Sequence, residues 1–231
     1  MIKAIFIDID DTLLSFSGYV KQAMKDGFRK FGFKEYDETM YQTFNEVNSG
    51  LWRQIEDGSL TFSELKKIRW NMVFKELDID FDGEKFEEYF REELSHSAIV
   101  EPGAYKMLEY LSKKYVLCAA SNGPHDQQIN RLRIGKLYDF FDYYFISESV
   151  GAQKPSREFF DYCIKKLRED GMDGLLPEEI MIIGDSVSAD MLGGKQYGIK
   201  TCLYNVNNKY SVKGEEADYM VNSLLDTMNI L

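Results

Sequence analysis

The sequence contains few of the residues that build zinc centres, disulfide frameworks and serine-hydrolase triads. Its 231 residues include two histidines, His96 and His125, and three cysteines, Cys118, Cys163 and Cys202. No cysteines form a C-x-x-C pair, so the spacing excludes a disulfide framework and a zinc site of that type. Two distant histidines cannot supply a three-histidine site, and the G-x-S-x-G turn of an α/β-hydrolase is absent.

Nucleotide-binding loops and long apolar runs are also missing. The sequence has no G-x-G-x-x-G, and its nearest P-loop-like string, Gly194-Lys195-Gln196, lacks the upstream glycine and the final Ser or Thr. No segment approaches the about 18 apolar residues that a transmembrane helix needs. The first residues lack the apolar region of a signal peptide. We therefore expect a cytoplasmic protein with no membrane partner, as a monomer or homodimer.

The charge balance is acidic, with 39 Asp and Glu against 28 Lys and Arg and a net charge of −11. Proteins that bind nucleic-acid polymers or anionic membranes usually have the opposite balance, so both partners are disfavoured. A small phosphorylated molecule can still bind where a metal ion or a lysine reverses the local field. The hydrophobic content of 44%, with 14% aromatic residues, is sufficient for a folded core.

Five short apolar runs, separated by helical patterns, predict a parallel sheet. The runs lie at 4–7, 116–120, 143–146, 181–183 and 201–204. Continuous apolar runs of this length are typical of strands that are buried on both faces. The helical patterns between them cover 105–113, 127–137, 158–168 and 189–197. This alternation predicts an α/β fold with a doubly wound, Rossmann-like parallel sheet.

The segment 17–95 interrupts this alternation, because it contains helical patterns and no strand. The patterns cover 20–31, 38–48, a helix that begins at the capping box of Thr61 and Glu64, and 83–94. About 80 residues are too many for a crossover helix. We therefore expect an inserted all-helical domain at 17–96 and a core domain formed by 1–16 and 97–231. The charged segment 209–216 is expected to be a solvated loop.

The third helix of the insert shows a helical repeat of apolar residues. Its predicted buried stripe consists of Leu65, Ile68, Met72 and Leu77. This stripe would pack against the other helices of the insert.

Carboxylates follow two of the predicted strands. Asp8 and Asp10 come after the first run and Asp185 after the fourth, and ligands of such sheets bind beyond the carboxyl ends of the strands. Residues i and i+2 of an extended segment share a face, so Asp8 and Asp10 repel each other unless a cation is present. An all-oxygen ligand set suits Mg2+, with Mn2+ as the alternative. Helix or turn capping by Asp8 and Asp11 is the competing interpretation.

Two further segments could bind an anion at the same edge. Ser121 ends the second strand, and its hydroxyl, with the backbone N–H groups of Asn122 and Gly123, could donate to a phosphate. Lys154 could bind a phosphate and balance the carboxylates, with Pro155 at the first position of a helix from about residue 156. The competing interpretations are a simple turn for Ser-Asn-Gly and a solvated surface position for Lys154.

Together these residues resemble the motifs of the haloacid dehalogenase-like (HAD) hydrolase superfamily. The matching segments are Asp8-Ile9-Asp10-Asp11-Thr12-Leu13, Ser121, Lys154-Pro155 and Gly184-Asp185-Ser186-Val187-Ser188-Ala189-Asp190. They occur in the family's order and span almost the whole chain. The helical insert after the first motif is similar to the family's C1-type cap.

The resemblance implies a Mg2+-dependent phosphomonoester hydrolase. Asp8 would form an aspartyl-phosphate, and Asp10 would be the acid and base. Asp10 argues against a dehalogenase, because the family's dehalogenases lack this acid. The metal would bind the side chains of Asp8 and Asp185 and the backbone carbonyl of Asp10.

The other motif residues take supporting roles in the resemblance. Ser121, Asn122 and Lys154 would hold the phosphoryl oxygens. Thr12 would support the first motif. Asp190 would orient Lys154 or a metal-bound water.

The insert suggests the substrate. The segments 48–52 and 56–58 resemble the cap of the pyrimidine 5′-nucleotidase subgroup. Phe16 and Trp52 could stack on a base and Asn48 could contact the substrate, although packing and helix capping are the competing roles. The leading hypothesis is a pyrimidine-preferring nucleoside 5′-monophosphate phosphatase. The alternatives are a phosphatase for a sugar phosphate or another small phosphorylated metabolite, a phosphomutase similar to β-phosphoglucomutase, and an inactive binding protein, which the intact acid/base Asp10 disfavours.

Overall fold

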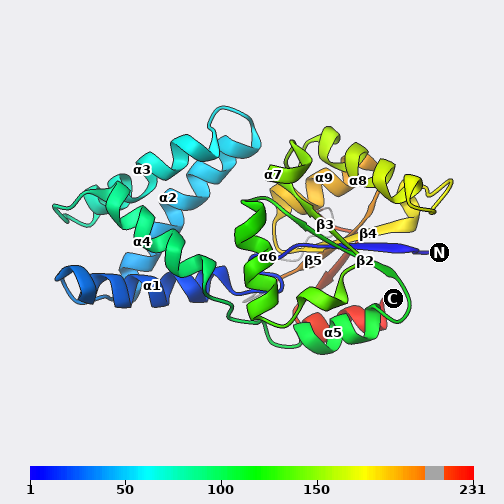
Figure 1. Ribbon diagram of the computed structural model, residues 1–231, viewed down its shortest axis with the longest axis horizontal. Helices are drawn as coiled ribbons and strands as arrows, with labels where there is room; N and C mark the ends of the chain where they lie inside the picture. Colours follow the sequence, from blue (N-terminus) through cyan, green and yellow to red (C-terminus); the bar gives the residue numbers. More distant parts are fainter. Residues whose placement is uncertain (206–215) are drawn as a thin grey trace. The chain divides into compact units, whose positions relative to one another are not determined.

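The computed structural model describes residues 1–205 and 216–231 (Figure 1). The chain divides into two compact units, and we call Met1–Ser15 with Ala98–Leu231 the core unit and Phe16–Ser97 the helical unit. The solvated loop expected at 209–216 lies outside the described residues, apart from its last residue. No helix among the described residues is both long and apolar enough to cross a membrane.

The core unit contains a six-stranded sheet in which all neighbouring strands pair in parallel. Its strands are β1 Ala4–Ile7, β2 Val116–Ser121, β3 Tyr143–Ile146, β4 Ile180–Gly184, β5 Lys200–Tyr204 and β6 Tyr219–Val221, in the order β3-β2-β1-β4-β5-β6. This topology confirms the predicted doubly wound, Rossmann-like α/β fold. β6 was not predicted, and it is a three-residue strand at the edge of the sheet.

The sheet is buried on both faces, as the continuous apolar runs predict. Ile5 and Ile7 of β1 pack into one cluster with helix α5 (Ala104–Leu111), whereas Ala4 and Phe6 pack into the opposite cluster with α8 (Arg157–Glu169). The register aligns the ends of β1, β2 and β4, since Ile7 pairs with both Ala119 and Ile183. The segments that follow these strands therefore meet at one edge.

The other described helices of the core unit connect its strands or follow the last of them. They are α6 (His125–Ile134), α7 (Ser147–Val150), a π-helical turn (Val187–Met191), α9 (Leu192–Tyr197) and 3₁₀ helices at Tyr138–Phe140, Pro177–Glu179 and Leu224–Asn229. One local expectation is wrong. Pro155 is not the first helical residue, because Ser156 caps α8 and its Oγ accepts a hydrogen bond from the Phe159 N–H at 3.4 Å.

The helical unit consists of α1 (Phe16–Phe31), α2 (Glu38–Glu56), α3 (Phe62–Glu76) and α4 (Gly83–Ser95). Its aromatic core surrounds the fully buried Trp70, which contacts Phe44, Phe86 and Phe90. The predicted capping box is present, since the Thr61 and Glu64 side chains each accept from the other's backbone N–H.

The predicted stripe of α3 is wrong in part. Leu65 and Leu77 are buried, but Met72 is 43% exposed. The helix instead buries Arg69, Trp70, Val73 and Phe74. The buried face includes a charged residue, which a pattern of apolar residues does not detect.

Candidate active site

Asp8 continues the β1 ladder, and the chain then turns sharply. The Asp8 N–H donates to the Ile183 carbonyl at 2.9 Å, which fixes the backbone beside β4. The turn is closed by the N–H groups of Leu13 and Leu14, which both donate to the carbonyl of Ile9. Asp8 is buried, whereas the Asp10 side chain keeps 32% of its surface exposed. The loop therefore presents two carboxylates in different environments.

The next turn contains Asp11 and Thr12. Asp11 has a φ of +53°, and its N–H donates to the carbonyl of Leu14 at 2.8 Å. Thr12 is buried, and its Oγ1 makes no hydrogen bond within the described part of the chain. The predicted supporting role of Thr12 therefore has no side-chain hydrogen bond behind it in the described part of the chain.

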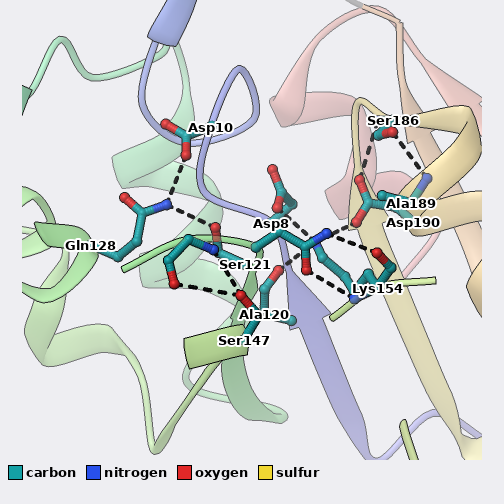
Figure 2. A network of polar contacts seen from close by, with 12 residues as sticks. Asp8, Asp10, Ala120, Ser121, Gln128, Ser147, Lys154, Ser186, Ala189 and Asp190 are labelled. Atoms are coloured by element: carbon teal, nitrogen blue, oxygen red, sulfur yellow. Dashed lines mark hydrogen bonds and ion pairs between the residues drawn. The ribbon is translucent and has the colours of Figure 1, made fainter. Parts of the chain in front are cut away.

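Lys154 lies at the centre of the polar network (Figure 2). Its Nζ donates to Asp8 Oδ1 at 2.7 Å, to Asp190 Oδ1 at 2.6 Å and to the Ala120 carbonyl at 2.6 Å. The side chain is only 1% exposed, which excludes the solvated surface position. Three acceptors satisfy the three N–H groups of a buried ammonium.

The backbone of Lys154 is held by Asn122. The Asn122 amide accepts from the Lys154 N–H at 2.9 Å and donates to the Lys154 carbonyl at 2.8 Å. The neighbouring Gly123 N–H donates to Ser147 Oγ at 2.9 Å. The Asn122 side chain thus joins two loops, so a phosphate contact from this residue would come from its backbone N–H.

Burial and charge shift the pKa values of this pair. Burial raises the pKa of Asp8 to about 7, against the opposing effect of Lys154, and the carboxylates of Asp190 and Asp10 add to the rise. Burial alone would lower the pKa of Lys154, but Asp190 and Asp8 raise it above its usual range. Lys154 therefore stays charged, and Asp8 ionises less readily than an exposed aspartate.

Asp190 is fully buried against Gly184. Its Oδ2 accepts from the Ser186 N–H at 3.2 Å, while Oδ1 accepts from Lys154. A Cβ atom on Gly184 would lie 2.1 Å from Asp190 Oδ2, so any side chain there would displace the carboxylate. Ser186 Oγ accepts from the Ala189 N–H at 3.1 Å and orders the turn between them. The geometry assigns Asp190 to the positioning of Lys154.

A carboxylate cluster that could hold a cation lies at the same place. Oxygen atoms of Asp8, Asp185 and Asp190 lie within 4.8 Å of one another. An all-oxygen donor set fits Mg2+ and excludes the thiolate and imidazole sites of zinc. Since both Asp190 oxygens accept from Lys154 and Ser186, Asp8 and Asp185 are the better ligands.

Sequence reasoning missed two residues of α6, Gln128 and Arg131. The Gln128 amide nitrogen donates to Asp10 Oδ2 at 2.7 Å and to Ser121 Oγ at 2.8 Å (Figure 2). Arg131 Nη1 donates to Asp10 Oδ1 at 2.5 Å and to Gln128 Oε1 at 2.8 Å. Both side chains are 1% exposed. Their spacing of i and i+3 on a helix was the available signal, but only the fold shows which face is buried.

The three residues predicted from the insert lie in the helical unit. Asn48 is buried, and its Oδ1 accepts from Arg69 Nη1 at 3.0 Å. Phe16 is half-buried at the start of α1, with its ring centroid 6.3 Å from that of Phe90. Trp52 is also half-buried, at 5.9 Å from Phe62. All three therefore have packing or hydrogen-bonding partners within their own unit.

The chain also matches a known family. Residues 2–198 match the family model described as haloacid dehalogenase-like hydrolase. The chain belongs to this family. It is 30% identical to the HAD-hydrolase YfnB of Bacillus subtilis, over 99% of this chain and 95% of that protein. The solved structure of YfnB bound to magnesium has a TM-score of 0.88 and covers 100% of this chain and 98% of its own.

Two relatives carry a more specific activity. The pyrimidine 5′-nucleotidases YjjG of Escherichia coli and PynA of Streptococcus pneumoniae are both 27% identical to this chain. The alignments cover 98% and 99% of this chain, and 96% and 94% of the relatives. The family and the similarity to this subgroup are therefore confirmed. As a HAD-like hydrolase, the chain presents a buried carboxylate, a buried ammonium and a second, more exposed carboxylate at one sheet edge.

Proposed function

We propose that this hydrolase is a Mg2+-dependent phosphomonoester phosphatase that acts through an aspartyl-phosphate on Asp8. The observation that carries the proposal is the buried Lys154 ammonium, which binds Asp8 and Asp190 beside the carboxylate cluster. A lysine in this position can neutralise phosphoryl oxygens next to the nucleophile, and a surface lysine cannot.

In the first step, an oxygen of Asp8 attacks phosphorus and the bond from phosphorus to the ester oxygen breaks. Asp10 gives a proton to the departing oxygen, so that an alcohol leaves. In the second step, Asp10 takes a proton from water, whose oxygen attacks phosphorus. The bond to Asp8 then breaks, and inorganic phosphate is released with Asp8 restored.

Ser121 would donate a hydrogen bond to a phosphoryl oxygen, and the Lys154 ammonium would offset the negative charge of these oxygens. The Lys154 N–H that donates to Asp8 in the structure is the one that would have to turn toward them. Asp8 and Asp185 would hold the Mg2+, with the Asp10 carbonyl as the further ligand that the family resemblance implies. When bound, the cation neutralises negative charge on the carboxylates and on the transferring phosphoryl group. Held by Asp8 and Asp185, its charge would oppose the effect of burial on the pKa of Asp8 and would favour the ionised nucleophile.

For the substrate, we propose a nucleoside 5′-monophosphate with a pyrimidine base. The support is the similarity to YjjG and PynA over nearly their whole length. Phe16 and Trp52 of the helical unit are the residues we assign to base recognition, whereas the buried Asn48 accepts a hydrogen bond from Arg69 within its own unit. Phosphatase activity on a sugar phosphate and mutase activity are the outcomes that would replace this assignment.

Phosphate release from a panel of phosphomonoesters tests the proposal. The panel contains UMP, dUMP, dTMP, CMP, AMP, GMP, phosphoglycolate and hexose phosphates, each with Mg2+ or EDTA. We expect release that EDTA abolishes and that falls at least about 10³-fold in Asp8→Asn. Asp126→Asn is the matched control, because Asp126 is exposed in the first turn of α6. Undiminished release by Asp8→Asn would refute the mechanism, and phosphate retained on Asp8 until a sugar phosphate is added would indicate a mutase.

A further inference from the structure

The Asp10 carboxylate is bound by two buried side chains that belong to none of the four motifs. Gln128 and Arg131 lie on α6, 118 and 121 residues away in sequence, and each donates to a different oxygen of Asp10. Asp10 itself lies on a tight loop and remains about a third exposed. Packing therefore restrains it little, and these hydrogen bonds fix where its carboxylate points.

The Gln128 amide has one orientation in this network. Its nitrogen supplies one hydrogen to Asp10 and the other to Ser121, while its oxygen accepts from Arg131. A flipped amide would place its oxygen against the Asp10 carboxylate and its N–H groups against the guanidinium, which is unfavourable at both ends. Arg131 thus orients Gln128, and Gln128 joins the proposed acid to the proposed phosphate ligand Ser121.

The geometry leaves Asp10 able to react. Each carboxylate oxygen can accept more than one hydrogen bond, so one bond from α6 leaves capacity for the substrate oxygen. A misplacement of about 1 Å in a reacting group can cost about 100-fold in rate. The two donors therefore control how well Asp10 can reach the departing oxygen.

We propose that Gln128 and Arg131 are positioning residues that hold Asp10 for proton transfer to the leaving group. The inference rests on the proposed function, in which the bond from phosphorus to the ester oxygen breaks as Asp10 donates its proton. The leaving group of an alkyl ester such as a nucleotide is a strongly basic alkoxide, which needs that proton. The leaving group of a nitrophenyl ester is a stable nitrophenolate anion, which does not need a proton. Loss of positioning should therefore slow alkyl esters selectively.

The test compares kcat/KM for UMP and for p-nitrophenyl phosphate with Mg2+ present. Each kcat/KM includes only the steps up to departure of the leaving group. The ratio of the two kcat/KM values is independent of the fraction of folded protein. We expect the ratio of UMP to p-nitrophenyl phosphate to fall about 10- to 100-fold in Gln128→Ala and in Arg131→Met. In Arg131→Lys, which keeps a hydrogen-bond donor, this ratio should fall less. The matched control is Gln127→Ala, at the adjacent position of the same helix.

Several outcomes would overturn the inference. Equal losses with both esters would show a structural role, and a higher ratio would show that α6 holds Asp10 away from the substrate. A calorimetric titration with Mg2+ should give the same Kd for Gln128→Ala and the wild type. A weakened Kd would mean that Gln128 acts through the metal site instead. Failure of the wild type to cleave either ester would refute the proposed function itself, and with it the inference.

Discussion

The helical unit contains a buried ion pair whose loss has a calculable cost. Arg69 on α3 donates to both oxygens of Glu87 on α4, at 2.6 and 3.0 Å, and each side chain is 4% exposed. Asn48 on α2 accepts a further hydrogen bond from Arg69, whose guanidinium also lies 4.9 Å from the ring of Phe90. The pair thus connects three of the four helices.

Removal of one partner should be far more costly than removal of both. Glu87→Met leaves a buried guanidinium without its counter-charge, and such losses cost about 3–5 kcal/mol of unfolding free energy. The double variant Arg69→Met/Glu87→Met buries apolar atoms instead and should lie within about 1–2 kcal/mol of the wild type. The exposed pair of Lys21 and Glu38, at 2.8 Å, gives the control. Glu38→Met should cost less than about 1 kcal/mol.

Tryptophan fluorescence during urea unfolding measures this cost in the intact chain. The protein has two tryptophans, Trp52 and Trp70, and both lie in the helical unit. The fluorescence transition therefore reports the unfolding of that unit. Two results would refute the reasoning: a loss of unfolding free energy in the double variant equal to the sum of the losses in the two single variants, or a loss below about 1 kcal/mol in Glu87→Met. A buried charge without its partner should cost more than that, and removal of the second charge should restore most of the stability.

Three further predictions concern the site and pH. Gly184→Ala should lower the unfolding free energy by about 1–3 kcal/mol and reduce phosphate release, since its Cβ would lie 2.1 Å from Asp190 Oδ2. Gly50→Ala is the control for both assays, because the space around its Cβ is open. Lys154→Met should lower kcat for UMP at least about 100-fold, measured against folded protein by circular dichroism, and a loss below tenfold, about 1.4 kcal/mol, would contradict its role. Burial raises the pKa of Glu87 above its ordinary 4.5, although the charge of Arg69 opposes the rise. Between pH 4.5 and the raised pKa, the folded unit therefore binds more protons than the unfolded chain. The unfolding free energy should therefore fall as pH rises from 4.5 through the raised pKa, and urea titrations of Glu87→Met should lack this slope.

Strands were the most predictable elements, because a strand buried on both faces must be apolar throughout. The runs at 4–7 and 143–146 coincide with β1 and β3. The run at 116–120 stops one residue before the end of β2, since Ser121 is polar yet buried. Because β6 has only three residues and an exposed Tyr219, it is recognised as a strand by its pairing with β5 at the edge of the sheet.

The motif residues could be predicted because the topology brings the ends of β1, β2 and β4 together. Oxygen atoms of Asp8, Asp185 and Asp190 cluster there, whereas the expected metal set had Asp10 in place of Asp190. Lys154 reaches this cluster from the loop before α8. The role of the Asn122 side chain could not be predicted. Its two hydrogen bonds go to a backbone 32 residues away, and no local pattern encodes that pairing.

Polar residues on helices were the main source of error, because a local pattern assigns them to solvent. Gln128, Arg131 and Arg69 are all buried, and each is satisfied by a partner on another element. Their burial depends on long-range pairing, and an unpaired charge in the same place would be strongly unfavourable.

The charges at the sheet edge explain how an acidic protein can act on a dianionic substrate. Four carboxylates, those of Asp8, Asp10, Asp185 and Asp190, lie at this edge with the buried cations Lys154 and Arg131. Burial is the largest cause of the raised pKa of Asp8, and the carboxylates of Asp190 and Asp10 add to the rise. A phosphate dianion would add to the repulsion at such a site. If Asp8 and Asp185 hold a divalent cation as proposed, its charge would favour the ionised form of Asp8 and would also offset the repulsion of the phosphate. On this reasoning metal binding and substrate binding are coupled, and the net charge of −11 is no obstacle to either.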